Sequence, residues 1–456
     1  MKSISGRTLM ALLLAGVLLF GLLTFVIRYG IYADDWISHS RSSGVRSIEE
    51  VTDRSGRVVY APHRDEPYAS DALVRRATVH LLGDLEGNID PLLLKQYIPQ
   101  LVGFDKINGT YGMQTGNGRV ELTVDGSVES VALQALAGRK GTVGVYNYKT
   151  GEVLCAVTAP SFDPYDAPAV PDAADSALEG LYLHRFFHVT YPPGSIFKLV
   201  TTAAALETVP DILDRTFTCA GEITVNGEII HCQSNKAHGE QTLGEALANS
   251  CNCAYAQIAQ LVGAEALTRK AKQIGITESL FVDGYRTKPG SFDLSGASKN
   301  RVAWAGIGQD VDLVNPCQYL TYMGAIANRG KAAMPYLVRR VSSGGAVRYE
   351  AETEWTEPMI TRKAADELAD LMHNNVVRMY APVNFSGVKV CAKSGTAEVN
   401  GKENTATFAG FIDSDQFPLA FIIVVEEGGS GAATCSPIAA NVLWACLNVM
   451  RSERSY

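Results

Sequence analysis

One long, uninterrupted apolar run lies near the start of the chain. Residues Leu9 to Ile27 form a stretch of 19 residues without a charge. At a rise of about 1.5 Å per residue, a helix of this length is roughly long enough to cross a bilayer core of about 30 Å. No later apolar run has a comparable length. The pattern therefore predicts one transmembrane anchor over residues 9–28, preceded by a short tail over residues 1–8.

The charges around this run predict the orientation of the anchor. Lys2 and Arg7 precede the run, whereas Arg28 and then Asp34–Asp35 follow it. More positive charge before than after the anchor favours a cytoplasmic N-terminus and an extracytoplasmic remainder. A cleaved signal peptide is the alternative, but Ile31 is a poor fit to the small residue expected at position −3 of a cleavage site. We expect a single-pass protein of the cell membrane.

Strand-like and helix-like patterns alternate along the remaining chain. Two short strands are predicted within residues 51–60, where apolar residues flank a Gly turn. Hairpins are predicted within residues 143–157 and 407–425, and a last helix is marked by Pro437 and apolar residues at helical spacing. This order of elements is typical of an α+β domain with an antiparallel sheet. The apolar content rises from about residue 128, so we expect a small N-terminal module over residues 29–127 and the α+β domain over residues 128–456.

Composition narrows the class of protein. The chain has 456 residues, of which 46% are hydrophobic and 19% charged, so it is not a disordered chain. Its 40 Lys and Arg against 48 Asp and Glu give a net charge of −8. This acidic balance argues against a nucleic-acid binder, which needs a basic surface to neutralise phosphates. Nine cysteines are too few for a disulfide-dense miniprotein of this length.

The most informative stretch for chemistry is Pro192–Lys198, which reads P-P-G-S-I-F-K. The prolines and the glycine end the preceding segment, and a helix is predicted to begin at Ser195. Ser195 and Lys198 are three residues apart, so their side chains share one helix face. A lysine whose pKa is lowered by desolvation or by a second cation can activate a serine as a nucleophile. An N-cap serine followed by a solvated lysine gives the same pattern, so this motif alone decides nothing.

Two further motifs follow at long intervals. Ser250 and Asn252 fall at a junction between two predicted helices, the first of which opens with a capping box. The run Lys393–Thr396, which reads K-S-G-T, follows a strand-like alternation, and Gly395 there is expected to let a ligand backbone approach the strand edge. Each motif alone fits an ordinary polar turn or strand end. In this order, with spacings of about 50 and 140 residues, they match the trio of serine β-lactamases and penicillin-binding proteins.

On these motifs the chain resembles the class B (monofunctional) penicillin-binding proteins, the D,D-transpeptidases of bacterial cell-wall synthesis. The resemblance implies a serine β-lactamase-like transpeptidase domain with an antiparallel sheet and a helical subdomain. About 100 residues separate the anchor from this domain, too few for an added glycosyltransferase domain. Further stretches resemble the same family: Asp53–Gly56, His80–Gly83, Thr150–Leu154, Pro160–Pro164 and Gly306–Gln309.

The resemblance also implies a role for each motif residue. Ser195 would attack the penultimate D-Ala carbonyl of a stem peptide, and Lys198 would accept the serine proton. Ser250 would relay a proton to the leaving amine, while Asn252 would bind the substrate amide and hold Lys198. The backbone N–H groups of Ser195 and Thr396 would form the oxyanion hole.

The K-S-G-T run would bind the substrate carboxylate. Lys393 would attract it and lower the pKa of Lys198, and Ser394, Gly395 and Thr396 would bind the carboxylate and the substrate backbone. Stem peptides and β-lactams are the ligands that this implies, with no metal or other cofactor. A membrane glycosyltransferase of the FtsW/RodA type is the implied partner of the anchor and the N-terminal module.

Alternative functions remain open at this point. A D,D-carboxypeptidase has the same chemistry with water as the acceptor, and a β-lactam sensor or a non-catalytic cell-wall scaffold has the same fold. A β-lactamase would need a base that activates water, for which we find no E-x-x-x-N pattern. The chain departs from the family at Ile196, at Asp310 and at Asn404–Thr407, where a small Thr, a Gly and a His-Ala-Trp segment are usual.

Cysteines and histidines cluster between the first and second motifs. Cys219, His231, Cys232 and His238 lie within twenty residues, which makes a zinc site conceivable. The spacing is irregular and the adjacent His231 and Cys232 would be awkward ligands. A disulfide between Cys219 and Cys232 is the favoured expectation, since the domain lies in an oxidising compartment. Cys251 is expected to pack as a small apolar residue.

Overall fold

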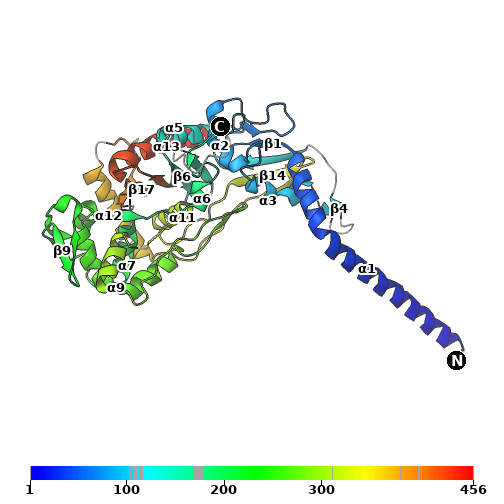
Figure 1. The fold of residues 1–456 in the computed structure, drawn as a ribbon, viewed down its shortest axis with the longest axis horizontal. Coiled ribbons are helices and arrows are strands. Elements are labelled where there is room, and N and C mark those ends of the chain that lie inside the picture. The colour runs from blue at the N-terminus through cyan, green and yellow to red at the C-terminus, as the bar shows by residue number, and fades with distance from the viewer. Residues whose placement is uncertain are drawn as a thin grey trace.

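The computed structural model describes residues 2–102, 104–105, 110–111, 117–168, 178–310, 312–380, 383–385, 387–398, 401 and 403–454. Helix α1 (Lys2–Arg46) projects from one end of the molecule (Figure 1). Its segment Gly6–Ile27 is apolar, long enough to cross a membrane and not buried at all against the protein. The predicted anchor of residues 9–28 therefore lies within a longer helix.

A five-stranded sheet lies next to α1. Its order is β15-β14-β5-β1-β2, and only the β1–β5 pair is parallel. The strand pair predicted within residues 51–60 is confirmed as β1 and β2. Two strands of this sheet come from residues beyond 330, so the sheet is built from both sides of the predicted boundary at residue 128. The bounds are β1 Ile48–Thr52, β2 Val58–Tyr60, β5 Gly118–Leu122, β14 Val338–Ser343 and β15 Ala346–Glu350, with the separate short pair β3 Phe104–Asp105 and β4 Thr110–Tyr111.

The second five-stranded sheet is antiparallel throughout, with the order β16-β17-β18-β6-β7. Both hairpins predicted for this region are confirmed, as β6–β7 and β17–β18. Alternate residues of the central strands face two cores, so that Phe411 and Ile422 pack on the side of α11, while Phe408 and Phe421 pack on the side of α13. The bounds are β6 Gly141–Asn147, β7 Val153–Ala159, β16 Val390–Ala397, β17 Thr405–Ile412, β18 Leu419–Val425, α5 Gly126–Leu136, α11 Pro316–Ala327 and α13 Gly431–Glu453.

Helix α13 corrects two expectations. It begins at Gly431, capped by Ser430, and includes Pro437 in its interior rather than starting there. It is also long and apolar enough to cross a membrane, but 61% of its apolar window is buried in the protein. The expectation that no later apolar segment is as long as the first was therefore wrong. The burial of this helix nevertheless identifies it as part of the protein core.

A helical region with small β-hairpins lies at the end of the molecule opposite α1, around α7, α9 and β9 (Figure 1). Its strands pair as β8–β11 and β9–β10, whereas the short pair β12–β13 lies against α2, where the Tyr285 hydroxyl donates to the His80 carbonyl at 3.1 Å. The bounds are η2 Gly194–Phe197, α7 Lys198–Thr208, β8 Thr216–Cys219, β9 Glu222–Val225, β10 Glu228–His231, η3 Gln233–Asn235, β11 Gly239–Thr242, α8 Leu243–Ala248, α9 Asn252–Gln273, β12 Phe281–Val282, β13 Tyr285–Arg286, α10 Lys299–Ile307 and α12 Arg362–Met379. The remaining helices are α2 Ala72–Leu82, α3 Leu92–Gln96, α4 Ile98–Val102 and α6 Arg185–His188.

Candidate active site

The serine of the first motif lies on a single 3-10 turn, η2, that leads directly into helix α7. The predicted helix from Ser195 is therefore confirmed except for its tighter first turn. Lys198, the first residue of α7, has a side chain with 0% exposure. Its Nζ atom lies 3.0 Å from Ser195 Oγ. The lysine is thus buried within hydrogen-bond distance of the serine hydroxyl.

The environment of Lys198 favours the neutral amine. Its Nζ donates to the Ser250 carbonyl oxygen at 2.7 Å and to Asn252 Oδ1 at 2.8 Å, both of which are uncharged acceptors. The Tyr255 ring lies beneath it, 5.5 Å from Nζ to the ring centroid. Burial, and secondarily the charge of Lys393, lowers the pKa of Lys198 to about 7. Near neutral pH this amine can therefore accept a proton.

Ser250 lies between two lysines. It occupies the turn between α8 and α9 with a left-handed backbone, φ 51°. Its Oγ is 3.3 Å from Lys198 Nζ and 3.1 Å from Lys393 Nζ. Lys393, which is 1% exposed, also donates to the Ser394 carbonyl at 2.9 Å, and burial lowers its pKa to about 7. The capping box predicted before this junction is confirmed.

A cleft of about 550 Å³ opens over these groups. Strand β16, at the edge of the sheet, forms one wall, and the α8–α9 junction forms another. The three predicted motifs, distant in the chain, thus meet in one cavity. Among its lining residues are Ser195, Ser250, Asn252, Lys393, Ser394 and Thr396.

Residues 141–444, more than half of the chain, match the family model described as the penicillin binding protein transpeptidase domain. The chain belongs to this family. The resemblance to the class B penicillin-binding proteins is confirmed, and so is the α+β transpeptidase fold.

Named relatives are similar over most of the chain. Stage V sporulation protein D of Bacillus subtilis is 26% identical over 82% of this chain, and "Peptidoglycan D,D-transpeptidase PbpA" of Mycolicibacterium smegmatis is 27% identical over 74%. The chain spans 58% of the length of the first and 74% of the second.

Solved structures match the fold. Penicillin-binding protein A of M. tuberculosis, as a ceftriaxone acyl-enzyme complex, is 22% identical with a TM-score of 0.76, covering 89% of this chain and 99% of that one. A structure titled "Structural coordination of polymerization and crosslinking by a peptidoglycan synthase complex" is 27% identical with a TM-score of 0.62, covering 73% of this chain and 63% of that one.

The K-S-G-T run of this penicillin-binding protein lies inside β16 rather than after a strand. A Cβ atom on Gly395 would lie 2.2 Å from Thr407 Oγ1 and 2.7 Å from the Pro193 carbonyl oxygen. Gly395 is therefore required for close packing of the serine segment against β16, and the approach of a ligand backbone at this glycine stays a prediction. The Thr396 hydroxyl accepts a hydrogen bond from Gly431 N–H at 3.2 Å.

Sequence reasoning missed Tyr380. This residue ends α12, is buried, and its hydroxyl both donates to Ser394 Oγ at 2.7 Å and accepts from Ser394 N–H at 3.0 Å. It also lines the cleft. Its position after an amphipathic helix gave no signal, because only the fold brings it beside β16.

The departures from the family leave the two lysines and the serines in place. Ile196 is wholly buried in the core. The carboxylate of Asp310 pairs with Arg301 at 2.8 Å, so its charge is compensated beside the loop. Asn404 lines the cleft directly.

The expected disulfide between Cys219 and Cys232 is wrong in this structure. All nine cysteines, each among the described residues, are free thiols. His231 also lies apart from the sulfur atoms, since it is exposed and its Nδ1 is 3.4 Å from Glu222. In its place Cys251 joins Cys219, Cys232 and His238.

Proposed function

We propose that this chain is a serine-type D,D-transpeptidase that cross-links peptidoglycan stem peptides through an ester on Ser195. The observation that carries the proposal is the buried amine of Lys198, 3.0 Å from Ser195 Oγ and with a pKa of about 7. A lysine in this state can remove the serine proton as the new C–O bond forms. Family membership and the names of the relatives support the same reaction.

In the first half-reaction, Ser195 Oγ attacks the carbonyl of the penultimate D-Ala. Lys198 takes the hydroxyl proton, and the N–H groups of Ser195 and Thr396 stabilise the oxyanion. The backbones that carry these N–H groups are adjacent, because a Cβ on Gly194 would lie 2.7 Å from the Thr396 carbonyl oxygen. One such donor is worth about 3 to 4 kcal/mol to the transition state.

The leaving D-Ala amine needs a proton as the C–N bond breaks. Ser250 lies between Lys198 and Lys393, so its hydroxyl can pass the proton from Lys198 to the amine. Lys393, with Ser394 and Thr396, binds the terminal carboxylate, and Asn252 binds the substrate amide. In the second half-reaction the amine of another stem peptide attacks the ester, loses its proton to Lys198 and releases Ser195. β-Lactams acylate the same serine.

Two experiments test the reaction. Peptide mapping of the adduct with a fluorescent penicillin should find the label on Ser195, and Ser195→Ala should remain folded without label. A labelled Ser195→Ala variant would contradict the assignment. Product analysis with a synthetic stem peptide ending in D-Ala-D-Ala, with and without an acceptor amine, separates cross-linking from the release of D-Ala to water.

We further propose that α1 anchors the chain with its N-terminus in the cytoplasm, and that the anchor and N-terminal module dock a membrane glycosyltransferase of the FtsW/RodA type. The exposed apolar segment Gly6–Ile27 supports the anchor. The similar structure titled as a peptidoglycan synthase complex supports the partner. Labelling of a Ser3→Cys variant by a membrane-impermeant thiol reagent from the cytoplasmic side only tests the orientation. Co-purification in mild detergent tests the partner.

A further inference from the structure

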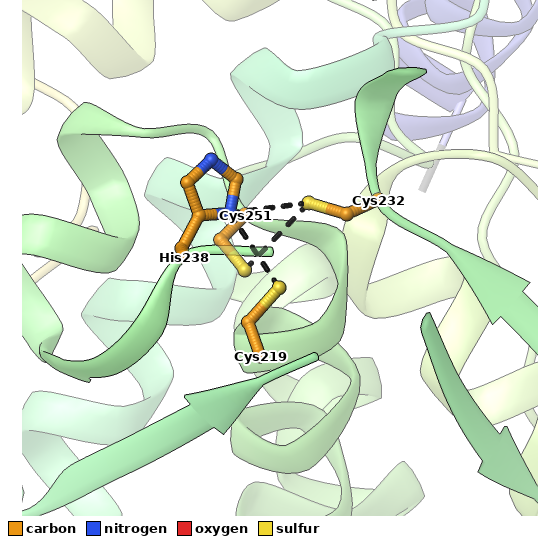
Figure 2. A group of neighbouring side chains, drawn as sticks. All are labelled: Cys219, Cys232, His238 and Cys251. Atoms are coloured by element: carbon orange, nitrogen blue, oxygen red, sulfur yellow. Dashed lines mark hydrogen bonds between the residues drawn. The ribbon is translucent and has the colours of Figure 1, made fainter. Parts of the chain in front are cut away.

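Four potential metal ligands converge next to the cleft (Figure 2). Their side chains point toward a common centre, and all four ligand atoms lie within 4.8 Å of one another. His238 Nδ1 is 3.5 Å from Cys219 Sγ and 3.5 Å from Cys232 Sγ, and Cys232 Sγ is 3.8 Å from Cys251 Sγ. One imidazole nitrogen thus faces two sulfur atoms at once.

These separations are those of a tetrahedral zinc site. With Zn–S of about 2.3 Å and Zn–N of about 2.0 Å, tetrahedral geometry places sulfur atoms about 3.8 Å apart and sulfur about 3.5 Å from nitrogen. A disulfide instead requires an S–S distance of about 2.05 Å. A single disulfide would also use only two of the three clustered cysteines and would leave the third as a free thiol. The cluster therefore fits one metal ion better than it fits a disulfide.

The backbone holds the ligands from three separate segments. Cys219 ends β8 and His238 immediately precedes its partner strand β11, and the His238 N–H donates to the Cys219 carbonyl at 3.1 Å. Cys232 follows β10, and its N–H donates to the Gly221 carbonyl at 2.8 Å. Cys251 caps α9, and its sulfur accepts from Ala254 N–H at 3.4 Å. An N–H donor to sulfur is the kind of outer contact that stabilises a bound thiolate.

Four residues form the tight group, and a further cysteine, Cys253, lies at its edge. Cys253 is buried beside the cluster, where its sulfur interacts with the sulfurs of Cys219, Cys232 and Cys251, but it is not one of the four ligand atoms that all lie within 4.8 Å of one another. The three clustered thiols are at most 2% exposed, so they form a closed site. Soft thiolates with one imidazole are a donor set that zinc prefers.

We propose that Cys219, Cys232, His238 and Cys251 bind one structural Zn²⁺ ion that joins the small β-hairpins to the α8–α9 junction. Four protein ligands leave no open position for water, so the ion is structural. Binding requires deprotonated thiols, and three thiol protons are released as the three Zn–S bonds form.

The metal would act on the active site through Cys251, a consequence that rests on the proposed function. Cys251 stands between Ser250 and Asn252, which both hold Lys198 Nζ. Asn252 Nδ2 also donates to the His231 carbonyl at 3.1 Å, next to Cys232. Fixing Cys232 and Cys251 to one ion therefore fixes the two segments that position the lysine, so metal loss should slow acylation of Ser195.

Metal analysis of the full-length protein in detergent tests the site directly. Protein purified without chelator and desalted should contain about one zinc ion per chain, because four ligands make one tetrahedral site. Replacement by Co²⁺ should give the absorption of tetrahedral cobalt with sulfur-to-metal charge transfer. Cys219→Ser, Cys251→Ser and His238→Ala should each lower the zinc content at least about tenfold, the size of effect seen even for outer contacts.

Matched variants keep the test independent of folding and of the reaction. His238→Cys preserves four ligands and should retain the zinc, as should Cys253→Ser, because Cys253 neighbours the cluster but is not one of the four ligands. Ser195→Ala should lose the penicillin label and keep its zinc, so failure of the proposed function is distinguishable. Two results would overturn the proposal. One is wild-type protein that contains no metal and shows a Cys219–Cys232 bridge when the unreduced chain is analysed by mass spectrometry. The other is a zinc content that is unchanged in Cys219→Ser and Cys251→Ser.

Discussion

Lys198 and Lys393 contact the same hydroxyl group: their Nζ atoms lie 3.3 Å and 3.1 Å from Ser250 Oγ. Two ammonium groups so close together repel each other in a buried site, and this repulsion adds to desolvation in lowering the pKa of Lys198. The pair is therefore most stable with one proton fewer than two separate lysines would carry. With one lysine neutral and the other charged, a proton can pass between them through the Ser250 hydroxyl. Each half of an acyl transfer needs such a proton transfer.

The first prediction concerns the pH dependence of acylation. Below a pH of about 7, Lys198 becomes protonated and can no longer accept the serine proton. Above about 7, Lys393 loses the charge that attracts the substrate carboxylate. We expect the second-order rate constant for a fluorescent penicillin to follow a bell-shaped profile with its maximum near pH 7. Because the two sites interact, the two limbs report the pair rather than either residue.

A second prediction separates the two limbs. Arg is not deprotonated in proteins, so Lys393→Arg should remove the fall in rate on the alkaline side while the acidic side persists. The larger side chain should reduce the maximal rate by about tenfold or more, as proton-transfer and positioning groups do. Rates measured from pH 5 to 10 on protein checked by thermal melting provide the test. An unchanged alkaline limb would show that Lys393 is not its origin.

Two substitutions of Ser250 should distinguish the contribution of its hydroxyl to acylation from that of its backbone conformation. Ser250→Ala removes the proton relay and should slow acylation by about 10² to 10⁴-fold. The wild-type serine already adopts the left-handed backbone at φ 51°, and alanine keeps the same Cβ, so Ser250→Ala should change the stability little through the backbone. Ser250→Gly removes the Cβ that strains this backbone, so it should match or exceed the wild-type stability and still leave acylation slow. Recovery of acylation in the glycine variant would assign the defect to the backbone instead.

The sheet and the three motifs were predictable from the sequence because each depends on local pattern. Alternating apolar residues define β6, β7, β17 and β18, and a proline-glycine stop followed by an apolar run defines η2 and α7. Joining residues 338–350 to the N-terminal sheet was not predictable, since strand pairing across more than 200 residues leaves no local signal.

Two errors at the site have the same cause. The zinc and disulfide alternatives used only cysteines and histidines close in sequence, so they included His231 and left out Cys251. In the structure His231 lies outside the cluster and Cys251 lies within it, because β10 turns His231 outward while the start of α9 brings the Cys251 sulfur to Cys232. The packing role of Gly395 was likewise not predictable from local sequence, because the atoms that require a glycine there belong to Thr407 and to Pro193.

Tyr380 should affect substrate binding more than chemistry. Its hydroxyl holds Ser394 through two hydrogen bonds but contacts neither Ser195 nor the lysines in the described structure. Tyr380→Phe leaves the Ser394 N–H without its partner, which costs about 1 to 3 kcal/mol locally. We expect KM for a stem peptide to rise several-fold with little change in kcat. Tyr182→Phe is the matched control, because that hydroxyl donates to Pro168, away from the cleft. An equal effect of the two substitutions would contradict a role of Tyr380 in substrate binding.

The last prediction tests the packing of the serine segment against β16. A methyl group on Gly395 would overlap Thr407 Oγ1 at 2.2 Å and the Pro193 carbonyl at 2.7 Å, so Gly395→Ala must push Pro193 and η2 away from the strand. Overpacking of this kind costs about 1 to 3 kcal/mol of stability. A displacement of about 1 Å at Ser195 can cost about 10²-fold in acylation rate. Adding Thr407→Ala relieves only the first overlap and should restore stability in part, leaving acylation slow because the Pro193 contact persists. If Gly395→Ala alone acylates at the wild-type rate, this contact does not position the serine.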